Sequence, residues 1–281
     1  METEEIHLTF LGCGSMNEAI LSGILAGGFP ASQVTATVRR PERAAELRER
    51  HGITVLANSD DAEANRTAAD ADVVIIGVKP VGVADLLDEI SPALPHGAVV
   101  ISVAAAVSLE MLEAGLPAGQ PVIRSMPNTP SKVGRGVVSI SAGTSATEAT
   151  MSLAAELLSA TGRVVQVPED QVDAVSAVSG SGPAYAFYLA EAMARAGVEL
   201  GLDPELSAVL ARDTVAGAGY MLAEPGADAT VLRRGVTSPN GTTEAAIKSF
   251  DSQDLPGVIA RGARAAAERA AEITAELSAK K

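Results

Sequence analysis

The stretch that decides the fold reads IHLTFLGCGSMNEAIL and spans residues 6–21. Its apolar run, residues 6–11, predicts a buried strand. A helix follows, because apolar or small residues recur at helical spacing. These are Met16, Ala19, Ile20, Gly23 and Ile24. Strand and helix meet at the glycine turn Gly12-Cys13-Gly14, which is the local pattern of a dinucleotide-binding unit.

Each glycine of this turn has a separate physical role. Gly12 permits the tight turn, and Gly14 lets the backbone approach a pyrophosphate at the helix N-terminus. The third position of the fingerprint is Asn17, where glycine or alanine is usual. The competing interpretation is a glycine turn that binds no nucleotide.

The first half of the chain continues this alternation of strands and helices. A helix is predicted at residues 41–52, because Pro41 lies in its first turn and Gly52 follows its end. Runs rich in Val and Ile predict a mostly parallel sheet, buried on both faces between helices, in a Rossmann-type doubly wound α/β domain. These runs are residues 34–38, 72–78, 97–103, 121–125 and 136–141.

Sequence patterns typical of β-strands end near residues 165–170, and the rest of the chain is predicted to be all-helical. We therefore expect a dinucleotide-binding domain at residues 1–167 and a helical substrate and dimerisation domain at residues 168–281. The predicted helices span residues 170–200, 204–222, 243–251 and 254–279. Because this domain is small and poor in aromatic residues, we expect it to complete its core by dimerising.

Composition excludes several classes of protein. The formal charge of −14 argues against nucleic acid as a partner, because few bases are present to neutralise phosphates. No apolar run is long enough for a membrane span, and the N-terminus has no targeting pattern, so a cytoplasmic protein is expected. A single cysteine fits a reducing compartment. The five lysines and sixteen arginines fit either a salt-rich cytoplasm or an arginine-biased genome.

The end of the second predicted strand indicates the cofactor. An acidic residue at this point would bind the ribose 2′-hydroxyl of NAD, but the sequence here is Val38-Arg39-Arg40-Pro41. Arginine can bind a 2′-phosphate with two hydrogen bonds. NADP(H) is therefore favoured, with NAD(H) as the alternative. In the competing interpretation, Arg39 and Arg40 only solvate the strand end.

Three loops are expected at one rim of the sheet. Val78-Lys79-Pro80, Ser102–Ala105 and the MPNTP loop at 126–130 each follow a predicted strand. Because ligands of open parallel sheets bind at the carboxyl ends of the strands, these loops predict a cleft beneath the nicotinamide.

The sequence offers little acid–base machinery. All three histidines, His7, His51 and His96, precede residue 97 and none has an evident partner. Cys13 is better explained as a small residue between two glycines than as a nucleophile. No cluster of His, Cys and carboxylates has metal-ligand spacing, so no metal site is expected. The reaction should be one that needs few proton-transferring side chains.

Several longer motifs lie in the helical half. They are DAVSAVSGSGPAYAFYLAEAM (173–193), AGVELGL (196–202) and VTSPNGTTEAAI (236–247). Together with GCGSMNEA, VKP and RSMPNTP, they resemble pyrroline-5-carboxylate reductase over essentially the whole chain. The resemblance implies reduction of Δ1-pyrroline-5-carboxylate to L-proline by NADPH or NADH. It also implies a Rossmann domain, interleaved helical domains in a dimer or a multiple of dimers, and an active site shared between two chains.

The resemblance also assigns site residues. It implies that the substrate carboxylate is bound by Ser238, Gly241, Thr242 and Thr243, and that Ser176 faces the reacting ring. The implied cofactor-binding residues are Gly12, Gly14, Ser15, Met16, Arg39, Arg40, Asn65, Val78, Lys79, Pro80, Ala104, Ala105 and Asn128. Asn65 lies one residue nearer the following strand than the family pattern expects.

Two further positions depart from the family pattern. Ala106 stands where the family has glycine, and Asn240 replaces the first glycine of SPGGTT. Asparagine tolerates a left-handed backbone, so Asn240 can still form the turn. We expect Ser238 or Thr242 to cap the helix at 243–251, and the free N–H groups of that helix start to form an anion site.

The chemistry of imine reduction agrees with the missing histidine and lysine. A protonated imine is already a strong electrophile, so orientation and a carboxylate anchor are the main needs. Thr243 is the candidate catalytic residue, near the ring nitrogen, with a bound water as the alternative. A β-hydroxyacid dehydrogenase would need a lysine base within 170–200, which has none. A non-catalytic NADP-binding regulator would lack the SPNGTT anion site.

Overall fold

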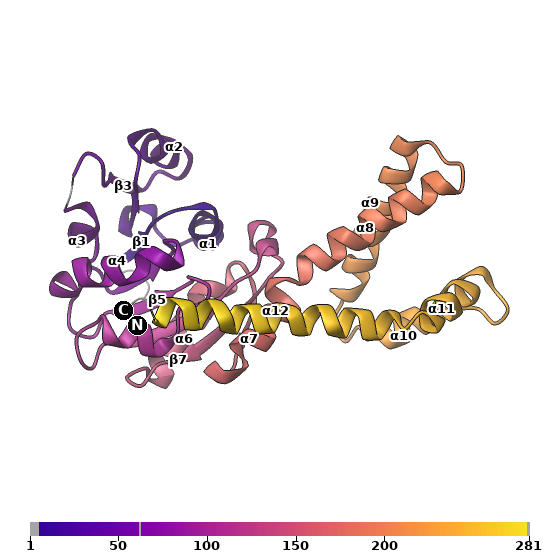
Figure 1. The fold of residues 1–281 in the computed structure, drawn as a ribbon. Helices are drawn as coiled ribbons and strands as arrows, with labels where there is room; N and C mark the ends of the chain where they lie inside the picture. Colours follow the sequence, from indigo (N-terminus) through magenta and orange to yellow (C-terminus); the bar gives the residue numbers. More distant parts are fainter. Residues whose placement is uncertain (1–5, 62, 280–281) are drawn as a thin grey trace. The chain divides into compact units, whose positions relative to one another are not determined.

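The structure is a computed structural model that describes residues 6–61 and 63–279 (Figure 1). Contacts divide the chain into two compact units, and each is described here by itself. The first unit runs to Gly180 and includes the chain from Ala267 onward, and the second is Ser181–Ala266. The division thus lies after Gly180, later than the boundary at 167 expected from the end of the strand pattern.

The first unit is built on one eight-stranded sheet with the strand order β3-β2-β1-β4-β5-β6-β7-β8. All neighbouring strands are parallel except β6 and β7, which are antiparallel. The mostly parallel Rossmann-type sheet expected from the sequence is thereby confirmed. The strands are β1 (Leu8–Leu11), β2 (Val34–Val38), β3 (Thr54–Ala57), β4 (Val73–Ile76), β5 (Val99–Ser102), β6 (Val122–Met126), β7 (Gly136–Ala142) and β8 (Gly162–Gln166).

Helices cover both faces of the sheet, and the side chains of the central strands alternate between the two layers. Phe10 and Ile75 pack towards the layer formed by α1 (Ser15–Ala26), α2 (Pro41–His51) and α6 (Glu148–Ser159). Leu11 and Ile76 pack towards the opposite layer. That layer contains α3 (Ala64–Ala68), α4 (Val83–Ile90), α5 (Leu109–Ala114) and Leu277. The two buried layers explain why the central strands are rich in Val, Ile and Leu, with few polar residues such as Thr9 and Ser102.

Short helices follow the sheet in the first unit. The 3₁₀ turns used below are η3 (Pro80–Gly82), η5 (Thr129–Val133) and η6 (Glu169–Gln171), and α7 (Val172–Val175) leads into a π-helical turn, η7 (Ser176–Gly180). The remaining 3₁₀ turns are η2 (Ala31–Gln33) and η4 (Ser91–Ala93). The continuous helix expected at 170–200 is therefore wrong. Pro183, which has no backbone N–H, lies in the first turn of the next helix, and the chain is interrupted at Ser181 between the two glycines.

The second unit is helical, as expected. It contains α8 (Gly182–Glu199), α9 (Pro204–Leu222), α10 (Ala229–Gly235) and α11 (Thr242–Ser252). α12 (Leu255–Ser278) begins in this unit and ends in the first. α10 was not expected, although Asp228 caps it by accepting a hydrogen bond from Val231 N at 2.8 Å. Among the described residues, no helix is long and apolar enough to cross a membrane.

Candidate active site

The glycine turn between β1 and α1 is held rigidly against β2. Gly12 N donates to Thr37 Oγ1 at 3.1 Å, and Cys13 N donates to Thr37 O at 2.7 Å. Gly12 has a left-handed backbone with φ +74°, and a Cβ there would lie 2.5 Å from Val78 Cγ1. The chain therefore needs glycine at position 12 for its own folding.

Gly14 is different, because the protein itself does not require a glycine there. Its backbone is extended, with φ −83° and ψ −166°, and an added Cβ would meet no atom within 4 Å. Gly14 and Ser15 are exposed, and no side chain caps the N-terminus of α1. Free N–H groups beside an open backbone suit a pyrophosphate, so the residues present fit a dinucleotide.

Cys13 lies inside this turn but is not reactive. The side chain is buried, and burial raises the pKa of the thiol to about 12. The nearby Glu18 carboxylate raises the pKa further, and Arg43 opposes this. A neutral, buried thiol is a poor nucleophile, which agrees with the expectation that Cys13 is only a small packing residue.

Arg39 and Arg40 lie between the end of β2 and the start of α2. Both are exposed, and neither forms an ion pair within the described residues. By contrast, Arg43 on the next turn is bound by Glu18 and by Glu46. The two guanidinium groups therefore remain free for a 2′-phosphate, and their contact with it stays a prediction.

Removing these guanidinium groups should change the choice of cofactor. We expect Arg39→Ala/Arg40→Ala to lower the NADPH:NADH ratio of kcat/KM about tenfold or more, because charge-assisted bonds to the 2′-phosphate are lost. Arg66→Ala is the control for loss of a half-exposed arginine elsewhere, since Arg66 lies on α3 and pairs with Glu63. An unchanged NADPH:NADH ratio of kcat/KM in the double variant would show that neither arginine binds the 2′-phosphate.

An ion-pair network ties the start of α1 to α2. The Glu18 carboxylate accepts hydrogen bonds from Arg43 and Arg50, and lies 3.2 Å from His51 Nε2. Burial alone would raise the pKa of Glu18, but the hydrogen bonds from Arg43, His51 and Arg50 outweigh it and lower the pKa. The expectation that no histidine has a partner is therefore wrong for His51, which α2 brings against α1, and also for His7, whose Nδ1 lies 3.7 Å from Asp72 Oδ2.

The loops after β4 and β5 differ in exposure. Lys79 is exposed at the start of η3, whereas Val78 and Pro80 are half-buried. After β5, Ala104 is buried and its N–H donates to Ser102 Oγ at 3.3 Å, whereas Ala105 is exposed. Ala106 has φ +60°, which explains why the family pattern has glycine at this position.

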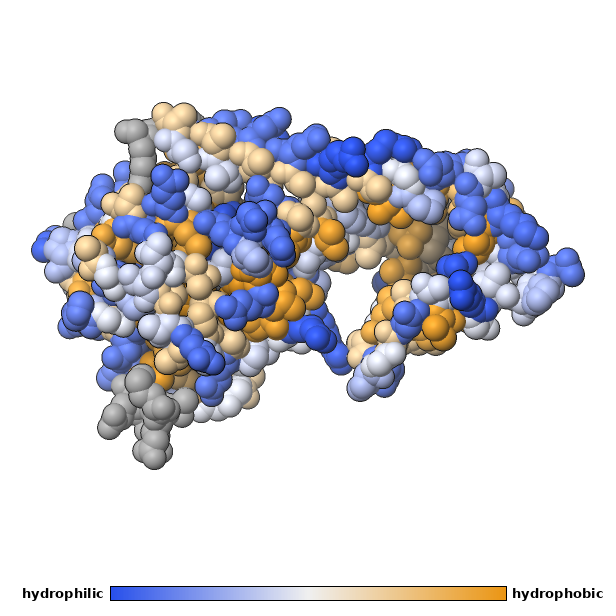
Figure 2. Space-filling model, turned by 90° about the horizontal axis from the view of Figure 1, so that it is seen from below, coloured by the Kyte–Doolittle hydropathy of each residue, from blue (hydrophilic) through white to orange (hydrophobic). Residues whose placement is uncertain are grey.

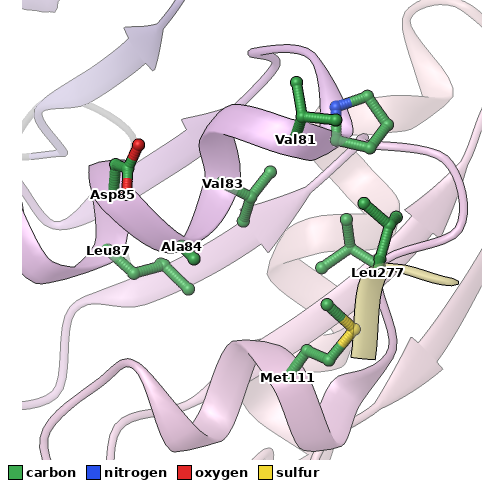
Figure 3. A pocket seen from close by; sticks show the side chains of 9 residues that line it. Val81, Val83, Ala84, Asp85, Leu87, Met111 and Leu277 are labelled. Atoms are coloured by element: carbon green, nitrogen blue, oxygen red, sulfur yellow. The ribbon is translucent and has the colours of Figure 1, made fainter. Parts of the chain in front are cut away.

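A small apolar pocket lies behind η3, between α4 and α5 (Figure 3). Val81, Val83 and Met111 line it, together with Leu277 near the end of α12. Ser278 Oγ donates to Met111 Sδ at 3.4 Å. The last turns of α12 therefore pack on the helices that support the Val78–Pro80 loop.

Asn65 and Asn128 are both buried and both engaged within the protein. Asn65 Nδ2 donates to Glu89 Oε2 at 3.1 Å. Asn128 Nδ2 donates to Ser179 O at 3.0 Å, and its Oδ1 accepts from Val137 N at 2.9 Å. Asn128 thus joins the MPNTP loop to the π-helical turn, and the expected contacts of both asparagines with the cofactor stay predictions.

The π-helical turn contains Ser176, the residue expected to face the substrate ring. Ser176 is half-buried. Gly180 ends the turn, and a Cβ there would lie 3.0 Å from Met126 Cε and 3.2 Å from Ser176 Oγ. Single π-helical turns are frequent at functional sites. The role of Ser176 is not tested by this geometry and remains a prediction.

A half-buried ion pair that sequence reasoning missed fixes the approach to this turn. Arg124 Nη1 lies 2.9 Å from Glu169 Oε1, which also accepts a hydrogen bond from Leu109 N at 2.6 Å. Arg124 is buried on β6 and Glu169 begins η6. The available signal was an arginine inside an otherwise apolar strand, since such a buried charge needs a partner.

The SPNGTT segment forms the start of α11 in the second unit. Asn240 has φ +59°, which confirms that it takes the left-handed conformation of the replaced glycine. Gly241 is the N-cap residue, and no side chain caps the helix. The expected cap by Ser238 or Thr242 is therefore wrong, because the turn closed by Gly241 N and Ser238 O brings Gly241 to the cap position.

This uncapped helix start is electrostatically open to an anion. Thr242 and Thr243 are exposed on its first turn. Glu244 accepts a hydrogen bond from Asn240 N at 3.0 Å and pairs with Lys248 at 2.9 Å. The hydrogen bonds from Lys248 and from Asn240 N lower the pKa of Glu244. Lys248 offsets the charge of Glu244, so the N–H groups and hydroxyls can attract a carboxylate.

Two family models match the chain. Residues 7–106 match a family described as NADP oxidoreductase, coenzyme F420-dependent, and residues 169–273 match pyrroline-5-carboxylate reductase dimerisation. The first covers the strands around the glycine turn. The second covers the π-helical turn and the SPNGTT segment.

Individual proteins agree with the family models. A pyrroline-5-carboxylate reductase of Corynebacterium melassecola is 39% identical over 95% of this chain and 98% of its own length. That of Pseudomonas aeruginosa is 38% identical over 96% and 98%. The solved structure of a pyrroline-5-carboxylate reductase from Coxiella burnetii has a TM-score of 0.89 at 34% identity, over 95% and 98% of the two chains.

A more distant structure shows the same fold. The pyrroline carboxylate reductase of Plasmodium falciparum, solved with NADP bound, has a TM-score of 0.81 at 23% identity and covers 96% of this chain and 99% of its own. With near-complete coverage at 38–39% identity and a matching dimerisation model, this chain belongs to the pyrroline-5-carboxylate reductase family.

Proposed function

We propose that this protein reduces Δ1-pyrroline-5-carboxylate to L-proline with NADPH, and with NADH as a second cofactor. Family membership supports this reaction. Within the molecule, the observation that carries the proposal is the uncapped start of α11, with its Gly241 cap and two exposed threonines. This start suits a small carboxylate, and binding of a dinucleotide at the first unit does not require it.

The chain's own residues do three things in this reaction. The backbone at Gly12 and Gly14, with the free N-terminus of α1, binds the pyrophosphate. The N–H groups and hydroxyls of Ser238, Thr242 and Thr243 hold the substrate carboxylate and so orient the ring. When bound, the dihydronicotinamide supplies the hydride that C5 of the imine accepts.

The ring nitrogen must gain a proton as the C=N bond becomes C–N. Thr243 is the side chain proposed to donate or relay this proton, because its hydroxyl is exposed on the first turn of α11. Few other groups are available for this task. Cys13 keeps its proton and is buried, and Lys248 is engaged by Glu244.

Substitution of Thr243 tests the proton-transfer role. Thr243→Ala should lower kcat about 10–100-fold, below the roughly 100–10,000-fold of a typical general acid because water can replace part of the hydroxyl's role, and the fall should be steepest at high pH. Thr243→Ser, which keeps the hydroxyl, should retain most of kcat. A kcat unchanged in Thr243→Ala at saturating substrate would assign the proton to water instead.

One paired assay separates this function from its nearest alternative. NADPH oxidation with pyrroline-5-carboxylate is expected, and reduction of NADP⁺ with a hydroxyacid is not, because α8 has no lysine to act as base. Activity with the hydroxyacid alone would reject the proposed reaction.

The second unit supports a homo-oligomer, a dimer or a multiple of dimers, because it buries few apolar side chains by itself, and Figure 2 shows hydrophobic areas exposed on the surface. We place the enzyme in the cytoplasm, which agrees with its free, buried Cys13.

A further inference from the structure

Asn17, the residue that departs from the dinucleotide fingerprint, is buried where β1 and β4 end side by side. Its side chain is 1% exposed. Asn17 Nδ2 lies 3.4 Å from Leu11 O, 3.4 Å from Gly12 O and 3.5 Å from Ile75 O. These distances are long for single hydrogen bonds, so the amide is shared among three strand-end carbonyls and bridges the two strands.

The space for Asn17 exists only because residue 77 is glycine. A Cβ at Gly77 would lie within 2.5 Å of the Asn17 side-chain amide. A second glycine makes room in the same way for a side chain of the facing loop. A Cβ at Gly12 would lie 2.5 Å from Cγ1 of Val78, the residue that follows Gly77. Asn17 from α1 thus packs over Gly77, and Val78 from the β4 loop packs over Gly12. We call these two contacts the turn interlock.

Asn17 is not an evident choice for stability alone. Its Oδ1 is buried and has no hydrogen-bond partner among the described residues. A buried acceptor without a partner costs free energy of folding, and glycine or alanine at this position would avoid that cost. What Asn17 adds is a fixed connection between the Gly12–Gly14 turn and the Gly77–Lys79 loop.

We propose that Asn17 and Gly77 are a matched pair of positioning residues that set the affinity for the cofactor. The pair holds the glycine turn and the Val78–Pro80 loop at one spacing, so that both present their backbone to the dinucleotide together. The proposal rests on the assignment of the Gly12–Gly14 turn to the pyrophosphate. Neither side chain touches the reacting atoms, so the effect falls on cofactor binding and not on the chemical step.

A double-mutant cycle tests the pair. Asn17→Ala empties the space over Gly77, and Gly77→Ala forces a methyl group into the Asn17 amide. We expect each single variant to raise the Kd for NADPH about tenfold, measured by NADPH fluorescence, with kcat within about twofold of wild type. In the double variant the methyl group added at position 77 occupies the space that Asn17 leaves, so the Kd should return to within about threefold of wild type.

Ile24→Val is the matched control for general loss of stability. Ile24 is buried on the same helix but away from the turn. Its substitution should lower the melting temperature by about 2–4 °C and leave the Kd for NADPH unchanged. Hydrogen exchange of the Gly12–Ser15 amides without cofactor should become faster in Asn17→Ala and not in Ile24→Val.

Two results would overturn the inference. One is a lowered melting temperature in the single variants with an unchanged Kd, which would make Asn17 purely structural. The other is an additive Kd in the double variant. The proposed reaction fails separately, if wild-type protein binds NADPH but does not reduce pyrroline-5-carboxylate. In that case the Kd values of the variants still test whether Asn17 and Gly77 act together on NADPH binding.

Discussion

Replacing Gly14 with alanine is expected to weaken NADPH binding about 100-fold while the melting temperature of the cofactor-free protein changes by less than about 2 °C. The extended backbone of Gly14 suits any residue, and its Cβ would contact nothing in the protein. The methyl group would instead occupy the space where a pyrophosphate approaches the backbone. Fluorescence titration with NADPH and a thermal melt of the same sample measure the two quantities.

Gly12→Ala is the contrasting variant in the same turn. There the left-handed backbone and the Val78 side chain oppose a Cβ, so the melting temperature itself should fall by about 5 °C or more. If Gly14→Ala binds NADPH as wild type does, the pyrophosphate does not lie on this turn. If the melting temperature of Gly14→Ala falls as far as that of Gly12→Ala, a Cβ at Gly14 must clash with the protein itself.

The central sheet was predictable because its strands are buried on both faces and are therefore rich in Val, Ile and Leu. The two strands that the sequence pattern missed, β3 and β8, are the two edges of the sheet. Buried and more exposed positions alternate in β3, and no position of β8 is fully buried, so neither strand has a continuous apolar run. Edge strands carry a weaker sequence signal for this physical reason.

The candidate site was predictable where a motif acts locally and not where it acts through distant partners. The turn at Gly12 and the left-handed Asn240 follow from neighbouring residues. The role of Asn17 depends on Gly77, which follows a different strand, and the role of Arg124 depends on Glu169. Such pairs meet only once the strands are ordered in the sheet, and a single sequence does not show that order.

The second unit shows why this chain needs a second copy. Within α8–α11 only Ser207 and Ala211 are buried among the described residues, and both belong to α9. Large apolar and aromatic side chains are exposed instead, and Figure 2 shows hydrophobic areas on the molecular surface. Phe187 is 69% exposed, Tyr188 63% and Tyr220 67%. A helical unit without a buried core is not stable alone, so a partner of the same kind must cover these side chains.

Replacing Phe187 and Tyr220 with aspartate should therefore separate the subunits. Two charges in an apolar interface cost several kcal/mol, which exceeds what a dimer at micromolar concentration can lose. We expect the mass of one chain in sedimentation and a loss of activity of more than about 100-fold, because the family resemblance implies an active site shared between two chains. Glu224→Ala, an exposed change in the turn after α9, should keep both mass and activity. A fully active monomer would show that each chain contains a complete site, and an intact oligomer would place the interface elsewhere than on α8 and α9.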